Sequence, residues 1–171
     1  MASDNTPEML PPLGLLAELD ESLRRKLAAA GRFAAVPAGT RLAIQGEAHE
    51  TLTVLLSGKA KASCHAHGDY IELGIIKPGE TIGEMNMIDP QKASADVEIT
   101  ERADIWTIDD DQFTKIVETD PHAAFLVLKW LGRLLCRRLR ANADKMLAKA
   151  ELTRQTFRDL HVRQAIQRTD P

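Results

Sequence analysis

Hydrophobic and polar positions change their spacing twice along the chain, and the changes separate a helical start, a long stretch of strands and a helical end. Near the start, Leu23, Leu27 and Ala30 recur at the spacing of one helix face. Asp20 precedes them as a candidate N-cap, and Gly31 follows as a stop signal. The pattern predicts one short amphipathic helix between these two residues.

From Phe33 the period becomes two, which is the alternation of half-buried strands. Turn signals built on glycine recur every seven to twelve residues as far as Gly79. Short strands at this spacing are typical of an all-β sandwich or barrel. We expect strands at residues 33–36, 41–45, 52–57, 59–67, 70–76, 93–99 and 103–108.

Two helices are predicted after the strands. The acidic run at residues 109–111 can cap the first, and Asp120 followed by Pro121 can start the second. The second helix is apolar on nearly every side between Ala123 and Cys136, so it needs cover on every side. We expect one side to lie on the strands and the other to contact a second subunit.

A homodimer through this last helix is the assembly that the pattern predicts. Leu139, Asn142, Met146 and Ala150 keep a spacing of three or four residues, and an asparagine in such a seam sets the register of paired helices. The alternative is a single amphipathic helix packed on its own domain.

The composition is that of a soluble globular protein, with 44% hydrophobic and 27% charged residues among 171. The net charge of -3 predicts no nucleic-acid partner, and no apolar run is long enough for membrane insertion. The N-terminus lacks the features of a signal peptide, and Cys64 and Cys136 have no metal-ligand spacing. We therefore expect a cytoplasmic protein.

Residues 79–97 predict a site for a small anion. Gly79 and the pair Gly83-Glu84 expose backbone at the head of a short, mostly apolar helical turn. An alternating strand at residues 93–99 follows a polar break. Backbone amides at a helix N-terminus favour anions, so this stretch can act as a cradle.

The combination resembles the cyclic nucleotide-binding domain, the module of catabolite-activator and FNR-type regulators and of kinase regulatory subunits. The resemblance covers roughly residues 15–146. It rests on a phosphate-binding cassette at residues 83–97 and on the run from Cys136 to Leu139 in the last helix. It also rests on the turn glycines Gly39, Gly46, Gly58 and Gly79.

The resemblance implies a mainly β fold, a double-stranded β-helix or jelly-roll-like β-roll. An N-terminal helix, a short cassette helix and two C-terminal helices would flank it. The domain would span residues 13–146, between a disordered tail at 1–12 and a helical C-terminal extension at 147–171.

The resemblance also implies roles for the cassette. Glu84 would bind the ribose 2′-hydroxyl of cAMP or cGMP, and an arginine would neutralise the cyclic phosphate. Counting back from Val97, the arginine position holds Ala93, which strand parity points inward, with Lys92 on the other face. Losing a charge-assisted contact to a partly buried anion costs about 2–4 kcal/mol. We therefore expect weakened or lost affinity.

Further candidate ligand contacts lie in the hairpin, the cassette and the last helix, at Leu73, Gly83, Met85, Ser94, Ala95 and Asn142. Leu73 shares its predicted parity with Ala60 and Ile75, for which ordinary core packing is the alternative. The alternative for Asn142 is the dimer seam.

A second constellation, His65, His67 and Glu72, resembles the ligand spacing of cupin metal sites. A two-residue turn at Gly68-Asp69 would set His65 opposite Glu72. These three residues share the polar parity of the hairpin, which is the solvated face, so we expect no metal site. No nucleophile, Walker or dinucleotide-binding motif occurs either.

The sequence thus predicts a non-enzymatic regulatory or sensor domain that acts through protein–protein contacts of its C-terminal helices with a protein that the sequence does not identify. The residues from 147 to 171 are too few for a winged helix-turn-helix. The alternatives are a structural dimerisation module with no ligand and a cupin-like metalloenzyme that uses His65, His67 and Glu72.

Overall fold

The computed structural model describes residues 7–66 and 68–167. These residues belong to two compact units, Met1–Leu131 and Gly132–Pro171, and the long last helix is shared between the units. The first unit ends at residue 131, within α4.

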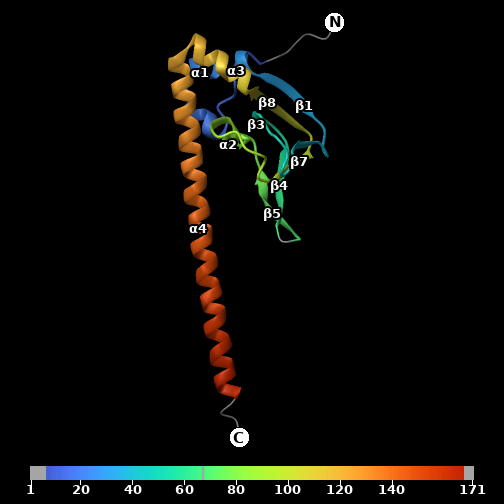
Figure 1. Cartoon of the computed structure of the whole chain (residues 1–171), viewed down its shortest axis with the longest axis vertical. Coiled ribbons are helices and arrows are strands. Elements are labelled where there is room, and N and C mark those ends of the chain that lie inside the picture. Colours follow the sequence, from blue (N-terminus) through green and yellow to red (C-terminus); the bar gives the residue numbers. More distant parts are fainter. Residues whose placement is uncertain (1–6, 67, 168–171) are drawn as a thin grey trace. The chain divides into compact units, whose positions relative to one another are not determined.

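The first unit is mainly β in the residues that are described, with two four-stranded antiparallel sheets (Figure 1). One sheet has the order β1-β8-β3-β6, with β1 at Arg32–Val36, β8 at Ala103–Asp109, β3 at Thr51–Leu55 and β6 at Thr81–Ile82. The other has the order β2-β7-β4-β5, with β2 at Arg41–Ala43, β7 at Asp96–Glu101, β4 at Lys59–Ala66 and β5 at Asp69–Ile76. The fold class expected from the sequence is confirmed.

Helices flank these sheets. The 3-10 helix η1 (Gly14–Glu18) and α1 (Glu21–Ala30) precede β1, and the short α2 (Glu84–Ile88) lies between β6 and β7. After β8 come α3 (Asp110–Thr119) and α4 (Pro121–Gln167). Within the first unit α1 packs beside α3, and α2 lies against β3 (Figure 1).

The helix boundaries follow local capping signals. The Asp20 side chain accepts a hydrogen bond from the Leu23 amide at 2.8 Å, so it caps α1 as predicted. Asp109 forms a capping box with Gln112 at the start of α3, and α4 begins at Pro121. These three predicted helix starts are confirmed.

The core lies between the two sheets and under α1 and α4. In the first sheet, Val54 is opposite Trp106 and Leu52 opposite Ile108, and all four side chains are buried. A second apolar cluster joins the facing sheets, at Val36, Ala43, Leu55, Ala60, Ile82, Ala93, Val97, Ile99, Ala103 and Ile105. Close packing of alternate strand residues therefore holds the two sheets together.

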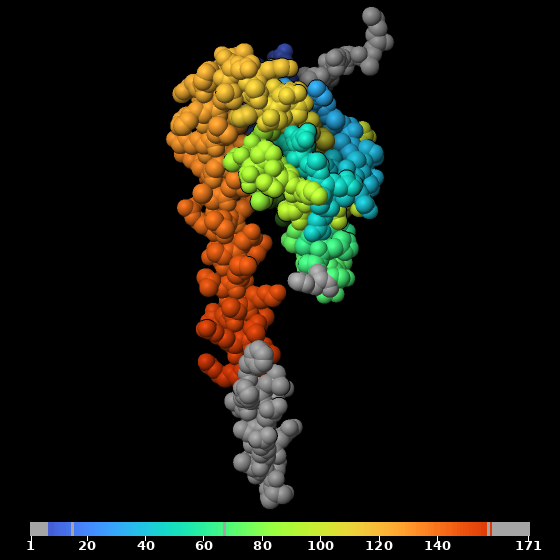
Figure 2. Space-filling view, viewed as in Figure 1, coloured from blue at the N-terminus to red at the C-terminus, as the bar shows by residue number. Residues whose placement is uncertain are grey.

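The β4–β5 hairpin differs from its predicted register. Ala66 is opposite Asp69, whereas the predicted turn at Gly68-Asp69 would set Ala66 opposite Ile71. His65 is consequently opposite Tyr70, with ring centroids 5.6 Å apart, and the prediction that it faces Glu72 is wrong. In Figure 2 this hairpin projects from the strand region.

A β-bulge overturns the predicted parity of β5. Ala62 is opposite Gly74 and Ser63 is opposite Glu72, so Leu73 is an extra residue without a β4 partner. Beyond the bulge Ile76 is opposite Ala60, whereas Ile75 is opposite Lys61 on the other face. The prediction that Leu73 and Ile75 share the inward face of Ala60 is therefore wrong.

The N-terminal segment is anchored before residue 13. Leu10 is fully buried, and its carbonyl oxygen accepts a hydrogen bond from the Arg24 guanidinium at 2.9 Å. The expected disordered tail at residues 1–12 therefore does not extend through Leu10. Residues 1–6 lie outside the described part of the chain.

The start of α4 has a covered and an uncovered side. Ala124, Val127 and Leu131 are buried in the first unit, whereas Phe125 and Leu128 are exposed. In the second unit, Leu139, Met146, Leu147 and Leu152 are exposed large apolar residues. No helix in the described ranges combines the length and apolarity that crossing a membrane requires.

Candidate functional site

The cassette begins at Gly83, which caps α2 in a left-handed backbone conformation with φ of 81°. A Cβ at this position would lie 2.1 Å from the Thr51 carbonyl oxygen and 2.5 Å from His49 Nε2. Glycine is therefore required both by the backbone angle and by the close approach of β3. The tight packing fixes the start of α2 against the first sheet.

Glu84 follows as the first residue of α2, and it is only 3% exposed. Its carboxylate accepts a hydrogen bond from the Thr81 hydroxyl at 3.1 Å. A buried carboxylate needs such partners because leaving one unpaired is costly. Thr81 was not among the predicted site residues, although the spacing Thr81-x-x-Glu84 resembles a capping box and could have indicated it.

Ala93 is 8% exposed and packs in the apolar cluster that also holds Ile82 and Val97. Its inward orientation agrees with the prediction, but the predicted cause does not, because β7 starts only at Asp96. The backbone of Ala93 is held instead by the loop before β3: its amide donates to the Glu47 carbonyl, and its carbonyl accepts from the Gly46 amide, each at 2.8 Å. The side chain of the neighbouring Lys92 is exposed.

The other predicted contacts are dispersed. Met85 on α2 is 56% exposed, Ser94 is exposed and Ala95 is half-buried. Leu73, in the β5 bulge, is 52% exposed. Asn142 is an exposed residue of the second unit, which is described apart from the cassette. Ala93 thus belongs to the same apolar cluster as Ile82, the residue before Gly83 and Glu84, whereas Leu73, Met85, Ser94 and Asn142 are exposed.

His49 is a cassette neighbour that sequence reasoning missed. It precedes β3, and its Nε2 atom is buried without a hydrogen-bond partner. Burial lowers the pKa of His49 below its ordinary value of 6.5, although the Thr51 backbone and the Glu84 carboxylate act in the opposite direction. No local pattern predicts this contact, because His49 and Gly83 come from separate parts of the chain.

The described residues contain no group of three His, Cys, Asp or Glu side chains arranged for a metal ion. His65 contacts Tyr70, and Glu72 lies opposite Ser63. His67, the third predicted ligand, lies outside the described residues.

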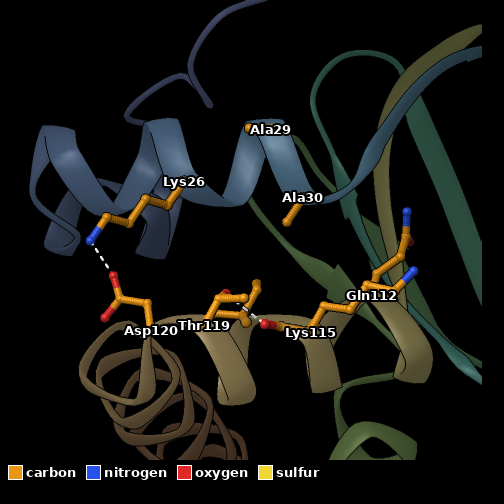
Figure 3. A pocket seen from close by; sticks show the side chains of 8 residues that line it. Lys26, Ala29, Ala30, Gln112, Lys115, Thr119 and Asp120 are labelled. Carbon is orange, nitrogen blue, oxygen red and sulfur yellow. Dashed lines mark hydrogen bonds and ion pairs between the residues drawn. The ribbon is translucent and has the colours of Figure 1, made fainter.

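One surface pocket of the described residues lies away from the cassette, and another borders it. One, of about 510 Å³, lies between α1 and α3, with Ala29 and Ala30 of α1 on one side and Lys115 and Thr119 of α3 on the other (Figure 3). Lys26 and Asp120 form an ion pair across one end of it. The other, of about 410 Å³, lies between α2, the residues before β3 and the acidic start of α3.

The comparisons with known proteins agree with this architecture. Residues 34–120, half of the chain, match the sequence model of the cyclic nucleotide-binding domain. The chain belongs to the cyclic nucleotide-binding domain family.

Individual relatives support the same fold. The chain is 30% identical over 105 residues to the cyclic AMP receptor protein of Thermus thermophilus, over 61% of this chain and 47% of the relative. A cyclic nucleotide-binding domain from Methylobacillus flagellatus superimposes with a TM-score of 0.72 at 24% identity, over 77% of this chain and 74% of that one. The Thermus thermophilus catabolite activator protein superimposes with a TM-score of 0.66 at 27% identity, over 78% and 61%. The chain thus spans about half the length of the curated relative.

Proposed function

We propose that this chain is a non-enzymatic cytoplasmic regulatory domain of the cyclic nucleotide-binding type, with weakened or lost affinity for cyclic nucleotides. The observation that carries the proposal is the buried methyl group of Ala93. By resemblance, this position belongs to the arginine that neutralises the cyclic phosphate. The two free cysteines, Cys64 and Cys136, suit a reducing compartment.

Electrostatics sets the size of the expected loss. A guanidinium binds a phosphate through two parallel charge-assisted hydrogen bonds, which a methyl group cannot replace. Losing them costs about 2–4 kcal/mol, or roughly 30- to 1000-fold in affinity. Glu84 remains as a buried acid within the cassette, and a carboxylate there disfavours an anionic ligand further. Met85, the exposed residue that follows Glu84, supplies no positive charge.

Melting temperature with cAMP and with cGMP tests this proposal. The wild type should show no shift at micromolar ligand, whereas Ala93→Arg should melt at a lower temperature without ligand and gain several degrees with it. Ser94→Arg is the matched control, because Ser94 is exposed and adds the same charge outside the apolar cluster. A shift of several degrees in the wild type would overturn the proposal. No gain in Ala93→Arg would show that the missing arginine alone does not explain the lost affinity.

We further propose that the domain acts as a homodimer through α4. Exposed apolar residues support this, since Phe125 and Leu128 are uncovered in the first unit. Leu139 and Met146, the latter 75% exposed, recur seven residues apart in the second unit, with Asn142 between them. This is the spacing of a paired-helix seam.

Light scattering at tens of micromolar tests the dimer. The wild type should have the mass of two chains, and Leu139→Lys should shift it toward one. Ala141→Lys places the same charge on an exposed residue outside the seam spacing, so it should remain dimeric. A monomeric wild type would contradict the proposal, and so would equal effects of the two substitutions.

A further inference from the structure

The ring of His49 lies directly against the first residue of the cassette. An ideal Cβ built on Gly83 would be 2.5 Å from His49 Nε2 and 2.7 Å from its Cδ2. Nε2 is buried and has no hydrogen-bond partner. Burial of the ring penalises its protonated form, and the Thr51 backbone and the Glu84 carboxylate offset this penalty only in part.

An acidic cleft of about 410 Å³ borders His49. His49 itself lines it, together with Asn86, Met87 and Pro90 of the cassette segment. Four carboxylates complete the lining, at Glu50, Asp109, Asp110 and Asp111, and no lysine or arginine is among the lining residues.

The acidic groups around His49 come from α2, from the segment before β3, from the end of β8 and from the start of α3. Glu84 of α2 interacts electrostatically with the ring, Glu50 is next to it in the chain, and the three aspartates belong to the end of β8 and the start of α3. Within this set Asp109 already caps α3 and lies 3.9 Å from the Arg32 guanidinium. Asp110 and Asp111 are exposed at the cleft and can accept from an imidazolium.

We propose that His49 is an acid-responsive switch of the cassette: on protonation its ring leaves Gly83 for the acidic cleft, and the start of α2 loosens from β3. The proton comes from solvent, and no bond other than N–H is formed. The cleft supplies both the room for the ring and the acceptors for its new donor. The switch requires no ligand, so it is independent of the proposed nucleotide affinity.

The direction of the pH effect follows from burial of the ring. Because burial lowers the pKa of His49 in the packed state, the packed state is favoured while the ring is neutral and loses stability as the pH falls through the pKa of the released ring. As the pH falls below 6.5, the released state binds the proton more readily and gains population. Each pKa unit between the two states changes their ratio by about tenfold.

Amide hydrogen exchange at residues 83–87, corrected for its intrinsic pH dependence, tests the switch between pH 7.5 and pH 5.5. Wild-type exchange should rise on acidification with the midpoint of the His49 ring titration seen by NMR. His49→Gln should abolish this rise, whereas His122→Gln removes an exposed histidine on α4 and should leave it intact.

The acceptors are tested separately with the double variant Asp110→Asn/Asp111→Asn. In this variant the His49 ring should leave Gly83 only at a lower pH than in the wild type. Amide exchange in the rest of α3 reports any direct effect of the substitutions on that helix. If His49→Gln does not fold, the wild-type titration still decides: a ring that titrates while residues 83–87 do not respond would refute the switch. An unchanged response in His49→Gln, or an unchanged midpoint in the double variant, would refute it as well.

Discussion

Replacing Gly83 with alanine measures how much the tight contact between the cassette and β3 contributes to stability. At φ of 81° an L-residue is strained by about 1–2 kcal/mol, partly offset by about 0.4–1 kcal/mol from a less flexible unfolded chain. The new Cβ would also lie 2.1 Å from the Thr51 carbonyl oxygen, a distance that backbone movement must relieve. Overpacking of this kind typically costs about 1–3 kcal/mol. We expect a total loss of about 1–5 kcal/mol.

Gly39→Ala is the matched control. Gly39 has nearly the same φ, 85°, and nothing lies within 4 Å of a Cβ built on it. It therefore carries the backbone strain without the clash, and its net cost should be about 1 kcal/mol. The difference between the two variants isolates the contact of Gly83 with Thr51 and His49.

Urea unfolding followed by tryptophan fluorescence is a suitable assay, because Trp106 and Trp130 are both buried in the first unit. The free energy of unfolding is obtained for each variant by linear extrapolation. Equal destabilisation by the two alanine substitutions would refute the reasoning, since it would mean that β3 yields to the added methyl group without cost.

Four further substitutions test the helix caps, the packing and an ion pair of the first unit. Asp109→Ala removes the capping box of α3 and should lower the free energy of unfolding by about 1 kcal/mol in urea titration. Leu131→Ala should cost about 2–5 kcal/mol in the same assay because Leu131 is fully buried, whereas Leu128→Ala, at an exposed position, should cost less. Two hydrogen bonds to the Asp120 carboxylate hold its pKa below the usual 3.8: the larger effect comes from the Lys26 side chain, and the next from the Ala123 amide. The melting temperature of Asp120→Asn should therefore fall below that of the wild type above pH 5, and the difference should vanish as the pH falls through the lowered pKa.

Several features of this protein are encoded locally and could be predicted from the sequence. The caps at Asp20 and Asp109 form hydrogen bonds with residues only three positions away, so the helix starts depend on neighbouring residues alone. The alternation of apolar and polar residues likewise predicts most strands, because side chains point to opposite faces at a period of two. The short β6 was missed, since two residues are too few to establish a period.

The candidate site was only partly predictable. Gly83 and Glu84 were found through a family resemblance, and the inward orientation of Ala93 was correct although no strand holds it there. The loop at Gly46 and Glu47 fixes Ala93 instead, through hydrogen bonds that span most of the β-roll sequence. Local parity has no information about such a distant partner.

Tertiary structure decided the remaining features. The bulge at Leu73 follows from how β5 pairs with β4, and it reverses the faces that simple alternation assigns beyond it. The contact between His49 and Gly83 exists because β3 passes beneath the start of α2. Short-range patterns determine where helices and strands form, because their hydrogen bonds and side-chain directions are local. Strand register and close backbone contacts depend on packing between segments that are distant in the sequence, and so do the polar groups at the cassette. Only folding brings those segments together.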